Sequence, residues 1–214
     1  MTKHVVVTGG AGFIGSNIVD AYLARGWYVT IIDNLSTGKR RNVDPRAALH
    51  ELDIRDRAAA DLIRELKPDV INHHAAQMDV RKSVEDPAAD ADVNVIGTLR
   101  LLEAAVDAAV KRVIFASTGG AIYGEPVEVP QTETHPLNPL SPYGCAKLAV
   151  GRYLNYYRVV RGLSSVALRY ANVYGPRQNA HGEAGVVAIF STALLNGEAP
   201  PLRGNGTPTR DYLH

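Results

Sequence analysis

The feature that most constrains the fold is a glycine-rich turn near the start of the chain, Thr8-Gly-Gly-Ala-Gly-Phe-Ile-Gly15. It follows a short β-branched run, His4 to Thr8, and it precedes a stretch from Ile14 to Arg25 with apolar residues at helical spacing. Glycine lets a backbone turn sharply and approach a pyrophosphate closely, and the amides that open the next helix attract an anion. A strand, this turn and a helix in that order predict a dinucleotide site, with an unliganded tight turn as the alternative.

The chain continues as an alternation of strand-like and helix-like segments. Further strands are expected at 28–32, 48–52, 70–73, 112–117 and 165–169, and further helices at 56–66, 88–109 and 142–160. Strands that are apolar throughout and are separated by helices indicate a parallel sheet covered on both faces. We therefore predict an α/β fold, a doubly wound parallel sheet of the Rossmann type.

The pattern loosens after Gly175-Pro176. A helix is expected from about Glu183 to Leu195, followed by a stretch rich in glycine and proline and a strand-like Tyr212-Leu213 near the end. We predict a dinucleotide-binding domain that carries the catalytic residues over 1–175, and the beginning of a smaller substrate-binding lobe over 176–214, which we expect to be incomplete.

Composition narrows the possible functions. With 23 basic and 22 acidic residues the formal charge is +1, so no basic surplus indicates nucleic acid. A single cysteine excludes an internal disulfide framework and a Cys-rich zinc site, and no apolar run approaches the length of a membrane span. No secretory leader pattern opens the sequence, so the cytosol is the expected compartment.

Asp33 ends the second expected strand, 18 residues after Gly15. A carboxylate there would accept hydrogen bonds from the adenosine ribose and repel a 2′-phosphate, which favours NAD over NADP, although Arg40 and Arg41 lie close by. The alternative is that Asp33 caps a turn. Asp53-Ile54 follows the third strand and is expected in reach of the adenine edge.

The fourth strand ends in His73-His74-Ala75-Ala76, and the two small residues would let a dinucleotide lie against the backbone. Adjacent side chains on an extended segment point to opposite faces. A metal pair is therefore disfavoured, and we expect packing or hydrogen bonding for the two histidines and no metal site.

Tyr143 and Lys147 are four residues apart at the start of an expected helix, and this spacing places both side chains on one face. An ammonium close to a phenol stabilises the phenolate, so the pair is suited to proton abstraction near neutral pH. Ser117-Thr118 ends the fifth strand, where a hydroxyl can bind a substrate hydroxyl or simply satisfy the turn. Cys145, between the two, is expected to be a buried helix thiol.

Taken together, these segments resemble the extended short-chain dehydrogenase/reductase family, and within it the UDP-glucose 4-epimerases and related nucleotide-sugar 4-epimerases. The segments that carry the resemblance are TGGAGFIG from Thr8, Asp33, HHAA from His73, NVIGT from Asn94, ASTGGAIYGE from Ala116, SPYGCAK from Ser141 and RYANVYGPRQ from Arg169.

The resemblance implies a role for each matching residue. Tyr143 would be the catalytic base, Lys147 would hold the nicotinamide ribose, and Thr118, with Ser117 beside it, would bind the substrate hydroxyl. Asn94 would anchor the helix and the cofactor site, and substrate would be bound by Thr118, Tyr143, Asn172 and Arg210. The expected cofactor contacts are Gly9, Gly12, Phe13, Ile14, Gly15, Asp33, Asn34, Asp53, Ile54, His74, Ala75, Ala76, Asn94, Tyr143, Lys147 and Tyr170.

The activity that the resemblance implies is NAD-dependent epimerisation of a nucleotide sugar at C4, with UDP-glucose and UDP-galactose as the expected pair and a homodimer formed through the helices at 93–109 and 147–160. A nucleotide-sugar reductase or dehydratase is the alternative within the family. Related 4,6-dehydratases carry an acidic pair after the threonine, where this chain has Gly119-Gly120. A non-catalytic dinucleotide-binding module is the alternative from another class.

Overall fold

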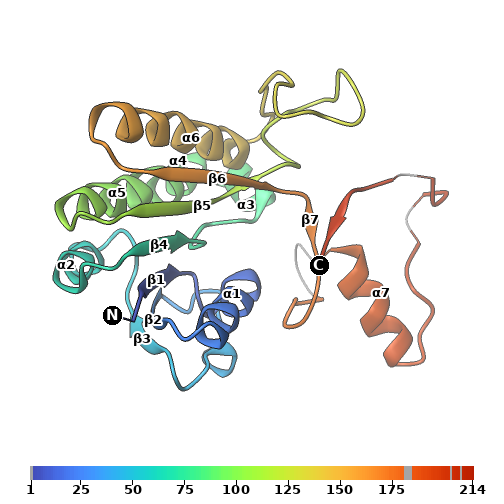
Figure 1. Cartoon of the computed structure of the whole chain (residues 1–214). Coiled ribbons are helices and arrows are strands. Elements are labelled where there is room, and N and C mark those ends of the chain that lie inside the picture. The colour runs from blue at the N-terminus through green and yellow to red at the C-terminus, as the bar shows by residue number, and fades with distance from the viewer. Residues whose placement is uncertain (1, 181–184, 203, 208) are drawn as a thin grey trace.

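The structure is a computed structural model that describes residues 2–180, 185–202, 204–207 and 209–214. Its centre is a parallel sheet of six strands in the order β3-β2-β1-β4-β5-β6 (Figure 1). The strands are β1 (His4–Thr8), β2 (Tyr28–Asp33), β3 (Ala48–Glu51), β4 (Val70–His73), β5 (Arg112–Thr118) and β6 (Ser165–Tyr170). The order turns outward in both directions from β1 and β4, which confirms the predicted Rossmann-type sheet.

The helices that cover the sheet are α1 (Phe13–Ala24), α2 (Arg57–Leu66), α5 (Thr98–Asp107) and α6 (Pro142–Val160). Side chains of α2, α5 and α6 form one large core with strand residues such as Ile71 and Phe115. On the other face α1 packs against Val5, Val7 and Ile31 in a smaller core. The two cores explain why the central strands are apolar on both faces.

The least covered part of the sheet is its β6 edge. In the part of the chain that the structure describes, Val166 is 40% and Leu168 37% exposed. Their register partners on β5, Ile114 and Ala116, are half-buried on the same face. Ala167 and Arg169, which alternate with them along β6, are exposed as well, so β6 is an open edge strand.

The expected helix at 88–109 is a run of three segments rather than one regular helix. It begins as α4 (Pro87–Ala91), passes through a π-helical turn at Asp92–Gly97, and continues as α5. π-Helical turns inside helices are rare and often mark functional positions, and this one contains Asn94. A short helix that the sequence analysis missed, α3 (Val80–Glu85), precedes α4.

The C-terminal part forms a separate small unit beside the sheet (Figure 1). Two short parallel strands, β7 (Asn172–Val173) and β8 (Tyr212–Leu213), pair with each other, and α7 (Val186–Leu195) lies between them in sequence. Glu183, the expected first residue of that helix, lies outside the described residues. An ion pair of 2.5 Å between Arg177 and Asp20 ties this unit to α1.

Candidate active site

The backbone packs so tightly at the glycine turn that Gly9 and Gly15 leave no room for a side chain. Gly9 has φ +70°, and a Cβ added there would lie 2.6 Å from the backbone nitrogen of Ala75. A Cβ at Gly15 would overlap the carbonyl oxygen of Gly9. The N-cap of α1 is Gly12, which supplies no side chain to the amides of the first turn. An uncapped helix start behind a turn without side chains fits a pyrophosphate, so the residues present are suited to the expected dinucleotide.

Asp33 anchors this turn to the end of β2. Its Oδ2 accepts a hydrogen bond of 2.9 Å from the amide of Ala11, and its Oδ1 accepts one of 2.8 Å from the amide of Leu35. Because a carboxylate offers about four lone-pair sites, these two bonds leave acceptor capacity for a ribose hydroxyl. Asp33 thus caps the turn, as the alternative interpretation held. It can still accept a hydrogen bond from a ribose hydroxyl.

Asn34 and Asp53 meet at the ends of β2 and β3. The Asn34 amide donates to Asp53 Oδ2 at 2.9 Å. Arg55 forms an ion pair of 2.9 Å with the same carboxylate, and its hydrogen bonds hold the pKa of Asp53 well below the usual range. Ile54 is buried and would contact a Cβ at Gly97, so its side chain belongs to the core of the domain. Its expected contact at the adenine edge stays a prediction.

The two histidines at the end of β4 point to different partners, as predicted. The His73 ring lies between two hydroxyls, 2.6 Å from Thr8 Oγ1 and 2.9 Å from Thr98 Oγ1. His74 Nε2 lies 3.2 Å from the hydroxyl of Tyr170. Burial first, and the positive charge of Lys147 second, lower the pKa of His73 to about 3 and that of His74 to about 4. Both rings are therefore neutral at pH 7, and both take part in hydrogen bonds within the domain.

Asn94 fixes the loop that follows β4. Its Oδ1 accepts from the amide of Gln77 at 3.0 Å, and its Nδ2 donates to the carbonyl of Gln77 at 2.9 Å and to Asp90 Oδ1 at 2.9 Å. The loop contains Ala75 and Ala76, both half-buried. Asn94 itself is buried, and its hydrogen bonds to Gln77 and Asp90 support the expected role of anchoring this loop to the helix.

Tyr143 and Lys147 lie together in the first turns of α6. The helix begins at Pro142 because the Ser141 hydroxyl accepts a hydrogen bond from the amide of Gly144. The Lys147 ammonium lies 5.6 Å from the centre of the Tyr143 ring and 4.7 Å from that of Phe115. It donates to the carbonyl oxygen of Ala116 at 3.0 Å. Burial lowers the pKa of Lys147 to about 8.

Ser117 and Thr118 occupy opposite faces of the end of β5. Ser117 is buried on the same face as Phe115, toward α6, whereas Thr118 is half-buried and pairs in register with Tyr170. The Thr118 hydroxyl accepts a hydrogen bond of 3.2 Å from the amide of Ala121, which closes the turn after the strand. One lone pair and the hydroxyl proton of Thr118 remain for a substrate.

The remaining predicted residues lie in the C-terminal unit or beside it. Asn172 donates to the carbonyl of Asp211 at 3.0 Å and so connects β7 to the segment before β8. Arg210 is exposed and donates to the carbonyl of Thr209. The expectation for Cys145 is wrong: it is exposed, because its position on α6 points away from the sheet.

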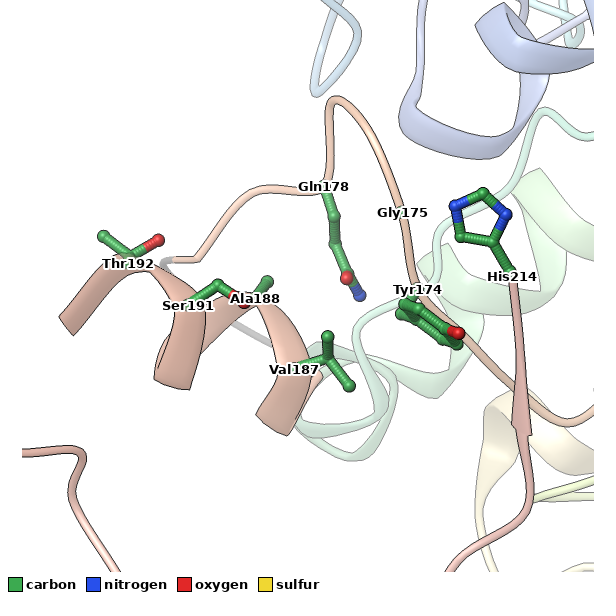
Figure 2. Close-up of a pocket in the computed structure, with 8 residues that line it drawn as sticks. All are labelled: Tyr174, Gly175, Gln178, Val187, Ala188, Ser191, Thr192 and His214. Carbon is green, nitrogen blue, oxygen red and sulfur yellow. The ribbon is translucent and has the colours of Figure 1, made fainter. Parts of the chain in front are cut away.

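The structure adds a pocket that the sequence analysis did not find. It holds about 350 Å³ between β7, α7 and the last residue, and Figure 2 shows the Gln178, Tyr174 and His214 side chains on one side of it and α7 on the other. Its lining is Tyr174, Gly175, Gln178, Val187, Ala188, Ser191, Thr192 and His214. A Cβ at Gly175 would lie 4.0 Å from the ring of Phe13, so the pocket borders the glycine turn. In the sequence, the one available indication of a pocket was the set of polar residues that follow RYANVYGP, such as Gln178.

No group of three or more His, Cys, Asp or Glu side chains suited to a metal ion occurs among the described residues. Within the same residues no helix is long and apolar enough to cross a membrane. A six-stranded Rossmann-type sheet, a glycine turn at its carboxyl edge and a buried lysine beside a helical tyrosine define a dinucleotide-dependent enzyme of the tyrosine–lysine type.

Comparison with known proteins gives the family. Residues 5–214 match the NAD dependent epimerase/dehydratase family, and the chain belongs to it. A UDP-glucose 4-epimerase of Mycolicibacterium smegmatis is 49% identical over 215 residues, which cover 98% of this chain and 69% of that protein.

Two solved structures are similar over the same extent. UDP-glucose 4-epimerase of Thermotoga maritima with UDP-glucose superposes with a TM-score of 0.94 at 48% identity, covering 98% of this chain and 69% of that one. UDP-glucose 4-epimerase of Thermus thermophilus in complex with NAD gives 0.90 at 49% identity, covering 98% and 70%.

Proposed function

We propose that this chain is an NAD-dependent nucleotide-sugar 4-epimerase that interconverts UDP-glucose and UDP-galactose. The observation that carries the proposal is the buried Lys147 ammonium beside the Tyr143 ring, at the edge of the sheet where β5 ends. Relatives with UDP-glucose and with NAD, at 48% and 49% identity, support the substrate and the cofactor.

Each catalytic side chain has one task in this reaction. Tyr143 takes the proton from the sugar 4-hydroxyl, and the charge of Lys147 stabilises the phenolate that this requires. Thr118 holds the same hydroxyl, whereas Ser117, its neighbour, faces α6 from the other side of the strand. When bound, NAD would supply the hydride acceptor for C4 and the hydride donor for the opposite face of the sugar. Tyr143 then gives its proton back, so the reaction consumes no cofactor.

The amino-terminal half of the sheet would hold the cofactor. The amides of the glycine turn and of Phe13 and Ile14 receive the pyrophosphate, Asp33 the adenosine ribose, and Asn34 with Asp53 the adenine edge. His74, Ala75, Ala76 and Tyr170 line the middle of the site, and Lys147 holds the nicotinamide ribose. Residues 1–175 form the domain that does this work.

Substrate is bound from the other side, by residues 176–214 together with Asn172. The polar pocket behind Gly175 is where part of the nucleotide sugar binds, and Arg210 contributes charge for a phosphate. Dehydration is disfavoured because Gly119 and Gly120, which follow Thr118, offer no carboxylate to remove a second proton.

A homodimer in the cytoplasm is part of the same proposal. Tyr153 and Tyr156 expose 42% and 43% of their surface on α6, and Val159 and Val160 extend the apolar strip. Tyr157, by contrast, is buried and donates to Glu103 on α5 at 2.5 Å, which fixes α6 against α5 as one rigid face for a second copy.

The test is turnover without an external electron acceptor. Purified chain with NAD and UDP-galactose should form UDP-glucose, measured by chromatography, until the equilibrium ratio is reached. A chain that binds NAD but forms no UDP-glucose would contradict the proposal, and a product lacking one water would favour the dehydratase.

A further inference from the structure

One buried carboxylate has no task in the mechanism above. Asp90 lies in α4 and is 1% exposed, and α4 packs against α6, the helix that carries Tyr143 and Lys147. The other buried acidic residue among those described is Asp33, whose two oxygens accept the amides of the glycine turn and of Leu35. Asp90 has no such partner in the backbone of the described residues.

The hydrogen bonds of Asp90 are one-sided. Its Oδ1 accepts from Gln77 Nε2 and from Asn94 Nδ2, both at 2.9 Å, and both donors are neutral amides. Its Oδ2 is buried and accepts no hydrogen bond in the described part of the chain. A carboxylate removed from water with one oxygen unsatisfied is costly unless a cation lies near it.

Among the described residues the one buried lysine or arginine is Lys147, which is 4% exposed and lies on α6, the helix that α4 contacts. The two side chains form no direct ion pair, so any attraction between them acts over more than 4.0 Å. Lys147 donates to the carbonyl of Ala116 and lies over the rings of Phe115 and Tyr143. None of these three groups carries a full negative charge while the Tyr143 hydroxyl is protonated. The negative charge of Asp90 opposes the effect of burial on the pKa of Lys147. The titratable groups that face Lys147 from β4 are His73 and His74, both neutral at pH 7.

We infer that Asp90 is a positioning residue, the counter-charge across the α4–α6 contact that keeps the Lys147 ammonium protonated beside Tyr143. Its value for catalysis rests on the proposed function, because a neutral lysine would not stabilise the phenolate. The same carboxylate holds Asn94, so one side chain sets both the charge of Lys147 and the position of the loop at 75–77.

The test measures Lys147 directly in the chain without ligands. Lysine labelled with ¹³C at Cε is titrated by NMR, and the Lys147 signal is assigned by its loss in Lys147→Met. Asp90→Asn keeps the shape and removes the charge. The matched control is Asp107→Asn, which removes an acidic side chain that pairs with Arg64 on the surface of α5.

We expect the titration midpoint of Lys147 to fall by about one pH unit or more in Asp90→Asn and to stay unchanged in Asp107→Asn. In turnover assays of Asp90→Asn, kcat should begin to change on the alkaline side at a lower pH than in the wild type, following the shift of the Lys147 midpoint. An unchanged Lys147 midpoint in folded Asp90→Asn would overturn the inference, whereas absent turnover in the wild type with a shifted midpoint would overturn the epimerase proposal alone.

If Asp90→Asn is too unstable to titrate, the inference is tested by comparing its stability with that of the double variant Asp90→Asn/Lys147→Met. It removes both charges, so it should be more stable than Asp90→Asn, because the unpaired buried ammonium is gone. A double variant as unstable as Asp90→Asn would show that the two charges are not coupled, and the inference would fail.

Discussion

Thr8 and His73, at the ends of two neighbouring strands, are joined by a hydrogen bond of 2.6 Å between Oγ1 and Nδ1. The other ring nitrogen meets Thr98, the first residue of α5. The ring therefore connects β1, β4 and the helix run through one neutral side chain. Because the ring is fully enclosed, a proton on it would have no water to share its charge.

Acid should destabilise the fold through this ring. The pKa of His73 is lowered to about 3, whereas an unfolded histidine has a pKa of about 6.5, so below pH 6.5 the unfolded chain binds a proton that the folded chain rejects. The contribution of His73 to the free energy of unfolding is fully present above pH 6.5. It is lost as the pH falls toward 3, by up to about 1.4 kcal/mol per pH unit. Urea unfolding of wild type and His73→Phe at pH 7 and pH 5 measures it. Equal pH dependence in the two proteins would refute this.

Gly15→Ala should destroy the cofactor turn. A methyl group there overlaps the Gly9 carbonyl, so the turn must open, and both stability and NAD affinity should fall. Gly151→Ala is the control: it lies in α6 with open space around its Cβ and should be neutral or stabilising by about 0.5–1 kcal/mol. Thermal unfolding with and without NAD compares them. A Gly15→Ala protein with wild-type NAD affinity would contradict the proposed pyrophosphate position.

Asp33→Ala should weaken NAD binding by about 10- to 100-fold, the effect of losing hydrogen bonds to a charged group of about 1.5–3 kcal/mol. Part of the loss comes from the ribose and part from the released amide of Ala11. Asp44→Ala is the control, because its carboxylate pairs with Arg46 in the loop before β3. Calorimetric titration with NAD gives both affinities, and equal values would remove Asp33 from the cofactor site.

Tyr143→Phe should lower kcat by about 10²- to 10⁴-fold, the usual contribution of a positioned acid or base, and leave NAD affinity nearly unchanged. Tyr153→Phe, further along the same helix on the exposed strip, is the matched control and should turn over normally. Chromatographic assays of UDP-glucose formation at saturating substrate compare the two. Full activity in Tyr143→Phe would require another base.

Local sequence was sufficient for the sheet and for locating the two motifs to which we assign the proposed chemistry. β1 and β4 have the predicted bounds, because a buried parallel strand must be a short apolar run whatever surrounds it. The helix α6 begins at its predicted residue because Ser141 and Pro142 specify the start. The glycine turn was identifiable because positions that leave no room for a side chain must be glycine, and the sequence shows those glycines directly.

What the sequence could not supply depends on contacts between distant segments. The helix α3 was missed because its charged residues lack apolar periodicity, although Asp79, which caps it by accepting from the amides of Arg81 and Lys82, was a usable signal. The clamp of Gln77 on Asp90 and Asn94 joins residues from a loop and two helical segments. Nothing in the order of residues predicts that these side chains meet.

The strand order β3-β2-β1-β4-β5-β6 also bears on how the protein is made. Read in the order of synthesis, each strand joins a free edge: β2 and β3 extend one side, and β4, β5 and β6 extend the other. A chain emerging from the ribosome therefore never has to open a finished pair to insert a later strand. The half that we propose to receive adenosine can be assembled while α6, the helix bearing Tyr143, is still untranslated.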